Sequence, residues 1–312
     1  QILLQMNKAY WKRKYREFRA LLYRQSLPGF NGIPIAIILK YVWKEILRDD
    51  IMVRSNSMAY SFFLSIFPGL LVILSLLPYL PIDNMVSAFQ RNYVDLLPTE
   101  MSTYINNIIV EMTQTGKEGL LSLSLLLAIF FASNGVSSML KGFHKSYETT
   151  YKKQNLLQRE WRAIYLTMLL GLFMVGSLVV IIIGKPILQN LLSADGLRNT
   201  NYAIYSYLRW LISFVFYYLG ISIIYRFGPA FKTKLRYFTP GATLATILSI
   251  ISSVLFSIYV TNIFAYNKIY GSIGALILIL VWLQLNSFII LLGYELNASI
   301  AINRDLLAQE EA

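Results

Sequence analysis

One carboxylate stands out for its chemistry because it lies within an apolar stretch. Glu295 falls near the end of residues 273–297, and it is the only carboxylate in the strongly apolar part of any long apolar segment. If that segment crosses a membrane, an ionisable side chain there needs a partner or a wet cavity. Two explanations stay open. Glu295 either pairs with a basic residue such as Arg54 or Arg236 and locks the helices together, or it lies on a substrate path.

Further polar side chains recur at helical spacing inside apolar stretches, so they form bands that should face the protein interior or a wet cavity. The candidates for a polar core or substrate path are Glu295, Asn297, Gln284, Asn286, Asn134, Ser137, Asn56, Tyr60, Ser61 and Ser65. The candidates for headgroup contacts or ion pairs are Arg54, Lys141 and Arg236, and the candidate kinks or hinges are Pro68, Pro240 and Gly271. Close packing of small side chains is the competing explanation. It is favoured for the four-residue series Gly241, Ala245, Ser249 and Ser253.

The residue types that most enzymes need are scarce in this sequence. It has no cysteine and one histidine, His144, and it contains no GxxxxGK[ST], HExxH or GxSxG motif. Its carboxylates form no cluster of the metal-binding type. We therefore expect no metal, no cofactor and no enzymatic activity.

Long apolar blocks must position the polar side chains. Of the 312 residues, 56% are hydrophobic and 14% are charged, whereas soluble domains have roughly 25% charged residues. Six blocks approach the roughly 20 residues that a helix needs to cross a bilayer, at about 53–77, 120–140, 163–183, 205–225, 240–264 and 273–297. They predict an all-α integral membrane protein with six transmembrane helices. One membrane domain at 31–303 would lie between a basic amphipathic segment at 1–30 and a tail at 304–312.

Shorter elements connect these blocks. Residues 34–49 place Ile38 and Val42 on one helical face and Lys40 and Lys44 on the opposite face. We expect amphipathic interfacial helices before the first span, at 1–24 and 34–49, and between the first and second spans, at 101–112. Residues 267–271 predict a tight loop between the last two spans.

The basic residues indicate the orientation in the membrane. Of the 28 Lys and Arg residues, 22 lie on the side that holds both ends of the chain. Because cytoplasmic loops carry an excess of Lys and Arg, the N- and C-termini should both be cytoplasmic. The formal net charge of +12 is then explained by anionic lipid headgroups, which are the expected partners, and not by nucleic acid.

Several motifs together resemble the YihY/BrkB family of bacterial inner-membrane proteins. They are SMAYSFFLSIFP at 57–68, YFTPGA at 237–242, YGSIGA at 270–275, and Trp282 followed by GYELN at 293–297. The resemblance covers about residues 35–303 and implies six helices and a multi-pass location in the bacterial cytoplasmic membrane. The family was once labelled ribonuclease BN, a label generally regarded as a misassignment. Its members have been linked to serum resistance and to the handling of envelope lipid.

The resemblance and the polar bands together favour non-ATP-driven transport or flipping of a lipid or other amphiphile. Two alternatives belong to other classes. A proton-coupled secondary transporter for a small solute would use Glu295 as its titrating group. A non-transporting scaffold for envelope assembly would have a second copy of the chain or envelope proteins as its partners.

Overall fold

The computed structural model describes residues 20–21, 23–48, 51–76, 118–143, 150–193, 201–263 and 267–310. Its helices are α2 (Ile35–Arg48), α3 (Ile51–Leu76), α6 (Glu118–Gly142), α7 (Leu156–Ser193), α8 (Asn201–Phe227), α9 (Pro240–Ile263) and α10 (Asn267–Glu310). Within these residues the only β pairing is an isolated antiparallel bridge between Tyr151 and Phe231. The predicted all-α fold is therefore confirmed for this part of the chain.

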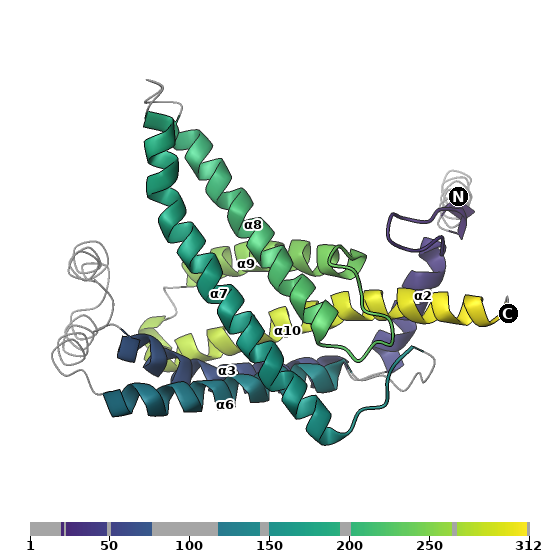
Figure 1. The fold of residues 1–312 in the computed structure, drawn as a ribbon, viewed down its shortest axis with the longest axis horizontal. Helices are drawn as coiled ribbons and strands as arrows, with labels where there is room; N and C mark the ends of the chain where they lie inside the picture. Colours follow the sequence, from purple (N-terminus) through teal and green to yellow (C-terminus); the bar gives the residue numbers. More distant parts are fainter. Residues whose placement is uncertain are drawn as a thin grey trace, which may run out of the picture.

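The helices form two groups that cross at a steep angle (Figure 1). In the first group α3 packs along α6 and against α10, and α10 also packs against α9. In the second group α7 and α8 lie side by side and rise away from the first group, with α7 in contact with α6 and α8 in contact with α9. Each of the six apolar blocks of the sequence forms one of these long helices.

Within the described residues, three helices are long and apolar enough to cross a membrane. These segments are Leu125–Gly142 in α6, Pro240–Val260 in α9 and Leu276–Gln309 in α10. Large hydrophobic side chains are also exposed along α7 and α8, such as Leu172 and Phe214. Water would not favour so much exposed apolar surface, but a lipid bilayer would.

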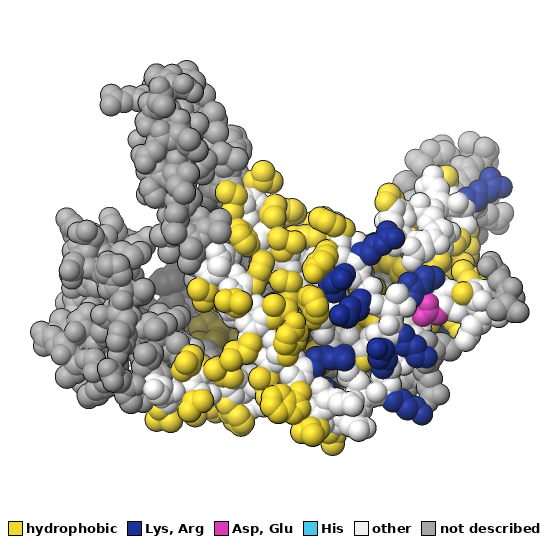
Figure 2. Space-filling view, in the orientation of Figure 1, with side chains coloured by type: hydrophobic (Ala, Val, Ile, Leu, Met, Phe, Trp, Pro, Cys, Tyr) yellow, Lys and Arg dark blue, Asp and Glu magenta, His cyan; other side chains and the backbone are white. Residues whose placement is uncertain are grey.

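The core gathers at one end of the molecule, where the start of α3, the end of α6 and the second half of α10 meet. Met58, Met139 and Leu291 come from these three helices and are almost completely buried. The same end carries most of the described Lys and Arg side chains, and the neighbouring face is hydrophobic (Figure 2). We call this the basic end. Lys152, Arg162, Arg226, Lys232 and Lys234 line one cavity there, Arg236 lines a neighbouring cavity with Arg226, and Arg54 contacts Gly142, the neighbour of Lys141.

The predicted amphipathic helix at 34–49 is present as α2. Ile38 and Val42 are buried in a cluster with Leu296 and Ile300 of α10, whereas Lys40 is exposed. The apolar face of α2 therefore packs on α10. The other predicted interfacial helices, at 1–24 and 101–112, lie largely or wholly outside the described residues, as does His144.

The predicted loop at 267–271 is wrong, whereas a hinge at Gly271 stays a prediction. α10 begins at Asn267 and continues through Gly271 without interruption. A single glycine costs a helix only about 1 kcal/mol relative to alanine. An open loop would cost more where water cannot satisfy the backbone, which explains why the helix continues.

The two proline candidates differ in position. Pro240 is the first residue of α9, where its missing N–H leaves no hydrogen bond unmade, so it starts a helix and does not kink one. Pro68 lies inside α3, which continues past it to Leu76. A bend at Pro68 stays a prediction. At the other end of the chain α10 extends to Glu310, through most of the segment expected to be a tail.

Candidate functional site

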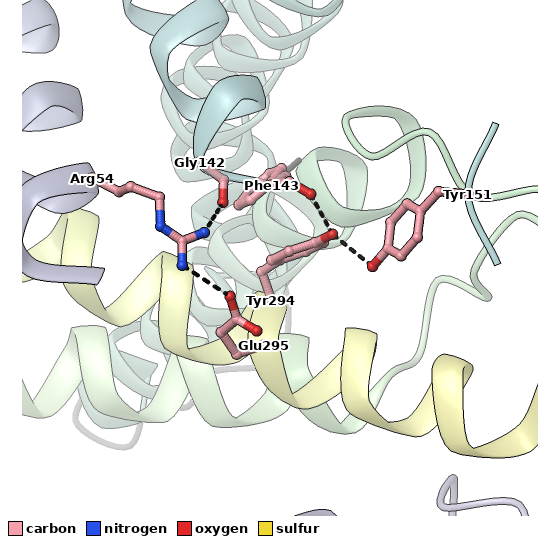
Figure 3. Close-up of polar contacts among 6 residues, drawn as sticks. All are labelled: Arg54, Gly142, Phe143, Tyr151, Tyr294 and Glu295. Carbon is pink, nitrogen blue, oxygen red and sulfur yellow. Dashed lines mark hydrogen bonds and ion pairs between the residues drawn. The ribbon is translucent and has the colours of Figure 1, made fainter. Parts of the chain in front are cut away.

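Glu295 and Arg54 form an ion pair where α10 packs against α3 (Figure 3). Arg54 Nη2 lies 3.6 Å from Glu295 Oε1, and the side chains are 21% and 1% exposed, respectively. The ion pair is thus the explanation for Glu295 that the structure supports. Arg236, the other basic residue considered, is exposed in the loop between α8 and α9.

The same guanidinium group caps the end of a third helix. Arg54 Nη1 donates a hydrogen bond of 2.6 Å to the carbonyl oxygen of Gly142, the last residue of α6. The carbonyl groups at a helix C-terminus have no partner within the helix and carry partial negative charge. A positively charged donor is therefore well placed here, and Glu295 balances its charge.

Tyr294, the neighbour of Glu295, caps the next carbonyl group. Its hydroxyl donates to the carbonyl oxygen of Phe143 at 2.5 Å and lies 2.8 Å from the hydroxyl of Tyr151. Because a phenol has one proton and Tyr294 uses it on Phe143, Tyr151 is the donor in the second bond. The Tyr294 ring also stacks on Phe143, with 4.3 Å between the ring centroids. We call Arg54, Gly142, Phe143, Tyr151, Tyr294 and Glu295 the polar node.

Asn297 performs a similar task at the start of α9. Its Oδ1 accepts a hydrogen bond of 2.9 Å from the backbone N–H of Gly241, and its Nδ2 donates to Thr239 Oγ1 at 3.1 Å. Thr239 Oγ1 also accepts from the N–H of Ala242 at 3.2 Å. The first free N–H groups of α9 are thus satisfied by its own N-cap and by a side chain from α10.

The polar candidates of α3 and α6 lie apart from Glu295. Ser61 is hydrogen-bonded to Ser138 at 2.9 Å and joins α3 to α6, while Ser137 donates to Glu160 of α7 at 2.8 Å. The remaining candidates are placed as follows: Asn56, Asn134 and Lys141 are exposed, Tyr60 is 61% exposed, and Ser65 donates to the carbonyl oxygen of Phe62 in its own helix. These side chains therefore do not line one cavity with Glu295.

The two amides in the middle of α10 are partly buried. Asn286 Nδ2 donates to the carbonyl oxygen of Trp282, one turn earlier in the same helix, at 2.9 Å. Gln284, two residues earlier in the helix, is half-buried. Neither amide reaches the polar node through a hydrogen bond that the structure records.

A large, mostly apolar groove lies between α8 and α9. Its volume is about 800 Å³, and it is lined by Leu211, Ser213, Phe214 and Tyr217 from α8 and by Ser249, Ile250, Ser253, Val254, Ser257 and Ile258 from α9. Three of the α9 residues are serines one helical turn apart, so they form a row of hydroxyl groups along an otherwise apolar wall. We call this cavity the α8–α9 groove.

Ser249 is a buried residue next to the α8–α9 groove. Its side chain is 0% exposed, and its hydroxyl has no hydrogen-bond partner among the described residues. A buried hydroxyl without a partner costs roughly 1–3 kcal/mol. The small-residue series to which Ser249 belongs therefore has two uses: Gly241 and Ala245 pack closely against Gly293 of α10, while Ser249 and Ser253 face the groove.

Sequence reasoning missed three features of this arrangement. Tyr294 and Tyr151 were not candidates, since an isolated tyrosine in an aromatic-rich membrane segment gives no signal. The α8–α9 groove was also missed, although the serines at 249, 253 and 257 and the residues at 213 and 217 recur at helical spacing.

Among the described residues, no group of three or more His, Cys, Asp or Glu side chains is placed to hold a metal ion.

Comparisons with known proteins identify a family. The family model described as virulence factor BrkB matches residues 42–312. The ribonuclease-like protein YfkH of Bacillus subtilis is 30% identical over 262 residues, which cover 83% of this chain and 94% of that protein. A UPF0761 membrane protein of Psychromonas ingrahamii is 26% identical over 276 residues, covering 88% of this chain and 89% of that protein.

A third relative matches a similar share of the chain. A UPF0761 membrane protein of Vibrio parahaemolyticus is 27% identical over 281 residues, covering 86% of this chain and 84% of that protein. No solved structure matches the chain. The similarity thus spans the helical region, and two of these three relatives are named as membrane proteins.

Proposed function

This chain belongs to the BrkB virulence factor family and is a multi-pass membrane protein, and we propose that it moves a lipid or another amphiphile across the bacterial cytoplasmic membrane without ATP. In this proposal α3, α6, α7, α8, α9 and α10 all cross the bilayer. The basic end lies at the cytoplasmic surface, together with both termini. The concentration of Lys and Arg at that end supports this orientation.

The α8–α9 groove is the observation that carries the proposal. Its volume of about 800 Å³ falls within the range of small-ligand sites, and most of its lining is hydrophobic. An acyl chain can lie on Leu211, Phe214 and Val254, while an ester carbonyl or hydroxyl of the same molecule accepts a hydrogen bond from the partly exposed Ser253. Amphiphiles combine these two chemistries, which a fully apolar or fully polar ligand does not.

The position of the groove also supports entry from the bilayer. Phe214, Val254 and Ile258 line it and are themselves exposed on the outside of the helices. A lipid can therefore reach the groove sideways from the membrane. The polar node holds α3, α6 and α10 together at the basic end. We therefore place the movement that accompanies transport between α8 and α9.

A bulky substitution in the groove tests this function. The full chain is reconstituted into liposomes that contain a lipid with a fluorescent headgroup, and lipid movement is followed by chemical quenching from outside. Ser253→Trp fills the groove and should slow lipid movement at least about tenfold. Ile251→Trp places the same side chain at an exposed position of α9 outside the groove lining and should leave the rate unchanged.

Other outcomes would contradict the proposal. If the wild-type protein moves no lipid but shows proton flux that follows a soluble substrate, it is a secondary transporter. If it moves neither and co-purifies with envelope proteins, it is a scaffold. Equal rates for Ser253→Trp and the wild type would remove the groove from the path.

A further inference from the structure

A second cavity, at the basic end, is lined mainly by cations and aromatic rings. It has a volume of about 230 Å³ and lies between the start of α7, the end of α8 and the loop that follows α8. Its charged lining consists of Lys152, Arg162, Arg226, Lys232 and Lys234, and the described lining includes no Asp or Glu. We call this cavity the cationic pocket. Five positive charges around so small a volume repel one another, and an anion within it would relieve that repulsion.

Two loops are joined so that their lysines face the same cavity. The antiparallel bridge between Tyr151 and Phe231 is closed by hydrogen bonds of 2.9 Å from Lys152 N to Ala230 O and of 2.9 Å from Lys232 N to Thr150 O. The Tyr151 and Phe231 rings stack with 4.7 Å between their centroids. Lys152 and Lys232 are therefore held near each other by backbone structure, and are not simply two mobile surface charges.

The arginines of the cationic pocket are partly fixed in place. Arg226 donates from Nη1 to the carbonyl oxygen of Leu235 at 2.6 Å, and its guanidinium carbon lies 4.2 Å from the centre of the Tyr237 ring. Arg226 also lines the cationic pocket, so these contacts hold its guanidinium group in the pocket wall. An oxygen-rich anion in the pocket would lie close to this charge.

Arg162, which also lines the pocket, is partly buried. This burial lowers the pKa of its guanidinium group below the ordinary value for arginine. Arginine remains protonated at neutral pH even so. The pocket thus contains a partly desolvated positive charge, for which an anionic ligand is a favourable partner.

An apolar surface leads away from the cationic pocket along α7. Tyr165 lines the pocket, and Met168, Leu172 and Val175 follow it at helical spacing, all of them exposed. Phe227 and Phe231 complete the aromatic rim. Figure 2 shows the Lys and Arg side chains directly beside this hydrophobic face. A ligand with a negative head and an apolar tail matches this arrangement, whereas a soluble anion would contact the cations but not the apolar surface.

We propose that the cationic pocket binds the phosphate group of an anionic membrane lipid, with the acyl chains of that lipid lying along α7. This goes beyond the proposed function, because it assigns a second lipid site whose acyl chains lie along α7 and not in the α8–α9 groove. A phosphodiester offers oxygen acceptors to Lys152, Lys232 and Arg226 at once. The cavity has room for one such headgroup and not for a folded macromolecule.

Lipid binding is measured on the full chain purified in detergent, by native mass spectrometry with added phosphatidylglycerol or phosphatidylcholine of identical acyl chains. The wild type should retain phosphatidylglycerol in preference. The double variant Lys152→Ala/Lys232→Ala should bind phosphatidylglycerol at least about tenfold more weakly. The matched control Lys40→Ala/Lys44→Ala removes the same charge from the exposed face of α2 and should bind as the wild type does. Unchanged thermal melting of both double variants verifies that they are folded.

Three results would overturn the proposal. Equal losses in the pocket and control variants would mean that only overall charge matters. Equal binding of the two lipids would mean that the headgroup is not recognised. Displacement of phosphatidylglycerol by low-millimolar inorganic phosphate would make a soluble phosphate the ligand. Because this measurement needs no transport, retained binding with no lipid movement would contradict only the proposed function, and lost selectivity with normal movement would contradict only the headgroup site.

Discussion

The carbonyl oxygen of Gly293 in α10 occupies the place where a Cβ atom on Gly241 of α9 would lie. Conversely, a Cβ atom on Gly293 would be 2.6 Å from the carbonyl oxygen of Gly241 and 2.8 Å from the Cβ atom of Ala245. Two helix backbones are therefore in direct contact, as small residues at membrane helix crossings allow. This contact brings Asn297 to the start of α9 and sets the position of the neighbouring Tyr294 and Glu295.

The helix crossing predicts a large effect of a single methyl group. Gly293→Ala should destabilise the protein by about 1–3 kcal/mol, because α9 and α10 must move apart. The free energy of unfolding can be measured by titration with SDS from mixed micelles. Gly171→Ala is the matched control, since a Cβ atom at this exposed position of α7 meets nothing within 4 Å. It should be neutral or slightly stabilising, and equal losses in the two variants would contradict the role of the crossing.

The ion pair predicts that Glu295 is needed for stability. Glu295→Gln leaves the Arg54 guanidinium without its counter-charge in a mostly buried place, so we expect a loss of about 2–4 kcal/mol by SDS titration. The control is Asp305→Asn, which removes a carboxylate from the more exposed pair with Arg304. That change should cost less than about 1 kcal/mol. A Glu295→Gln protein as stable as the wild type would show that the pair does not lock the helices.

The hydroxyl group of Tyr294 should matter independently of its ring. Tyr294→Phe keeps the stack on Phe143 but leaves a buried carbonyl oxygen and the Tyr151 hydroxyl without this partner. We expect a loss of about 1–3 kcal/mol, seen as a lower midpoint of thermal unfolding in detergent. Tyr259→Phe, at an exposed position of α9, should leave the midpoint unchanged. Identical midpoints for all three proteins would exclude the proposed cap of α6.

The start of α9 offers a fourth test. Asn297→Leu removes both the acceptor for the Gly241 N–H and the donor to Thr239, so unfolding should become easier by about 1–3 kcal/mol. Hydrogen exchange of the first turn of α9 should rise at the same time, because a free N–H exchanges with water. Asn303→Ala removes an amide that bonds only within α10, to Ser299, and should not change exchange in α9.

Local sequence signals were sufficient to identify the helices. The apolar blocks fill long segments without interruption, and the two faces of 34–49 differ in polarity, so the residues that form α2 and the six long helices could be recognised without any tertiary information. Gly271 shows where this reasoning fails. Glycine is a weak breaker, and a continuous apolar helix outweighs its cost when the alternative is a loop with unsatisfied backbone groups.

The polar contacts depended on tertiary structure. Arg54 meets the end of α6 across 88 residues of sequence, and Tyr294 meets Phe143 across 151 residues. Periodicity shows which face of a helix a residue occupies, but not which other helix that face meets. For this reason Tyr294 was overlooked, and Asn134 and Asn56, which share polar bands with buried serines, prove to be exposed.

The sequence by itself therefore determined the class of this protein and the segments that form its helices, because helix formation and membrane partitioning follow from local composition. Only the tertiary structure decided the partner of Glu295, the cap at the end of α6 and the two cavities. Those features require side chains from two or more distant segments to converge. Which helices pack on one another decides where they do so, and no local pattern encodes that packing.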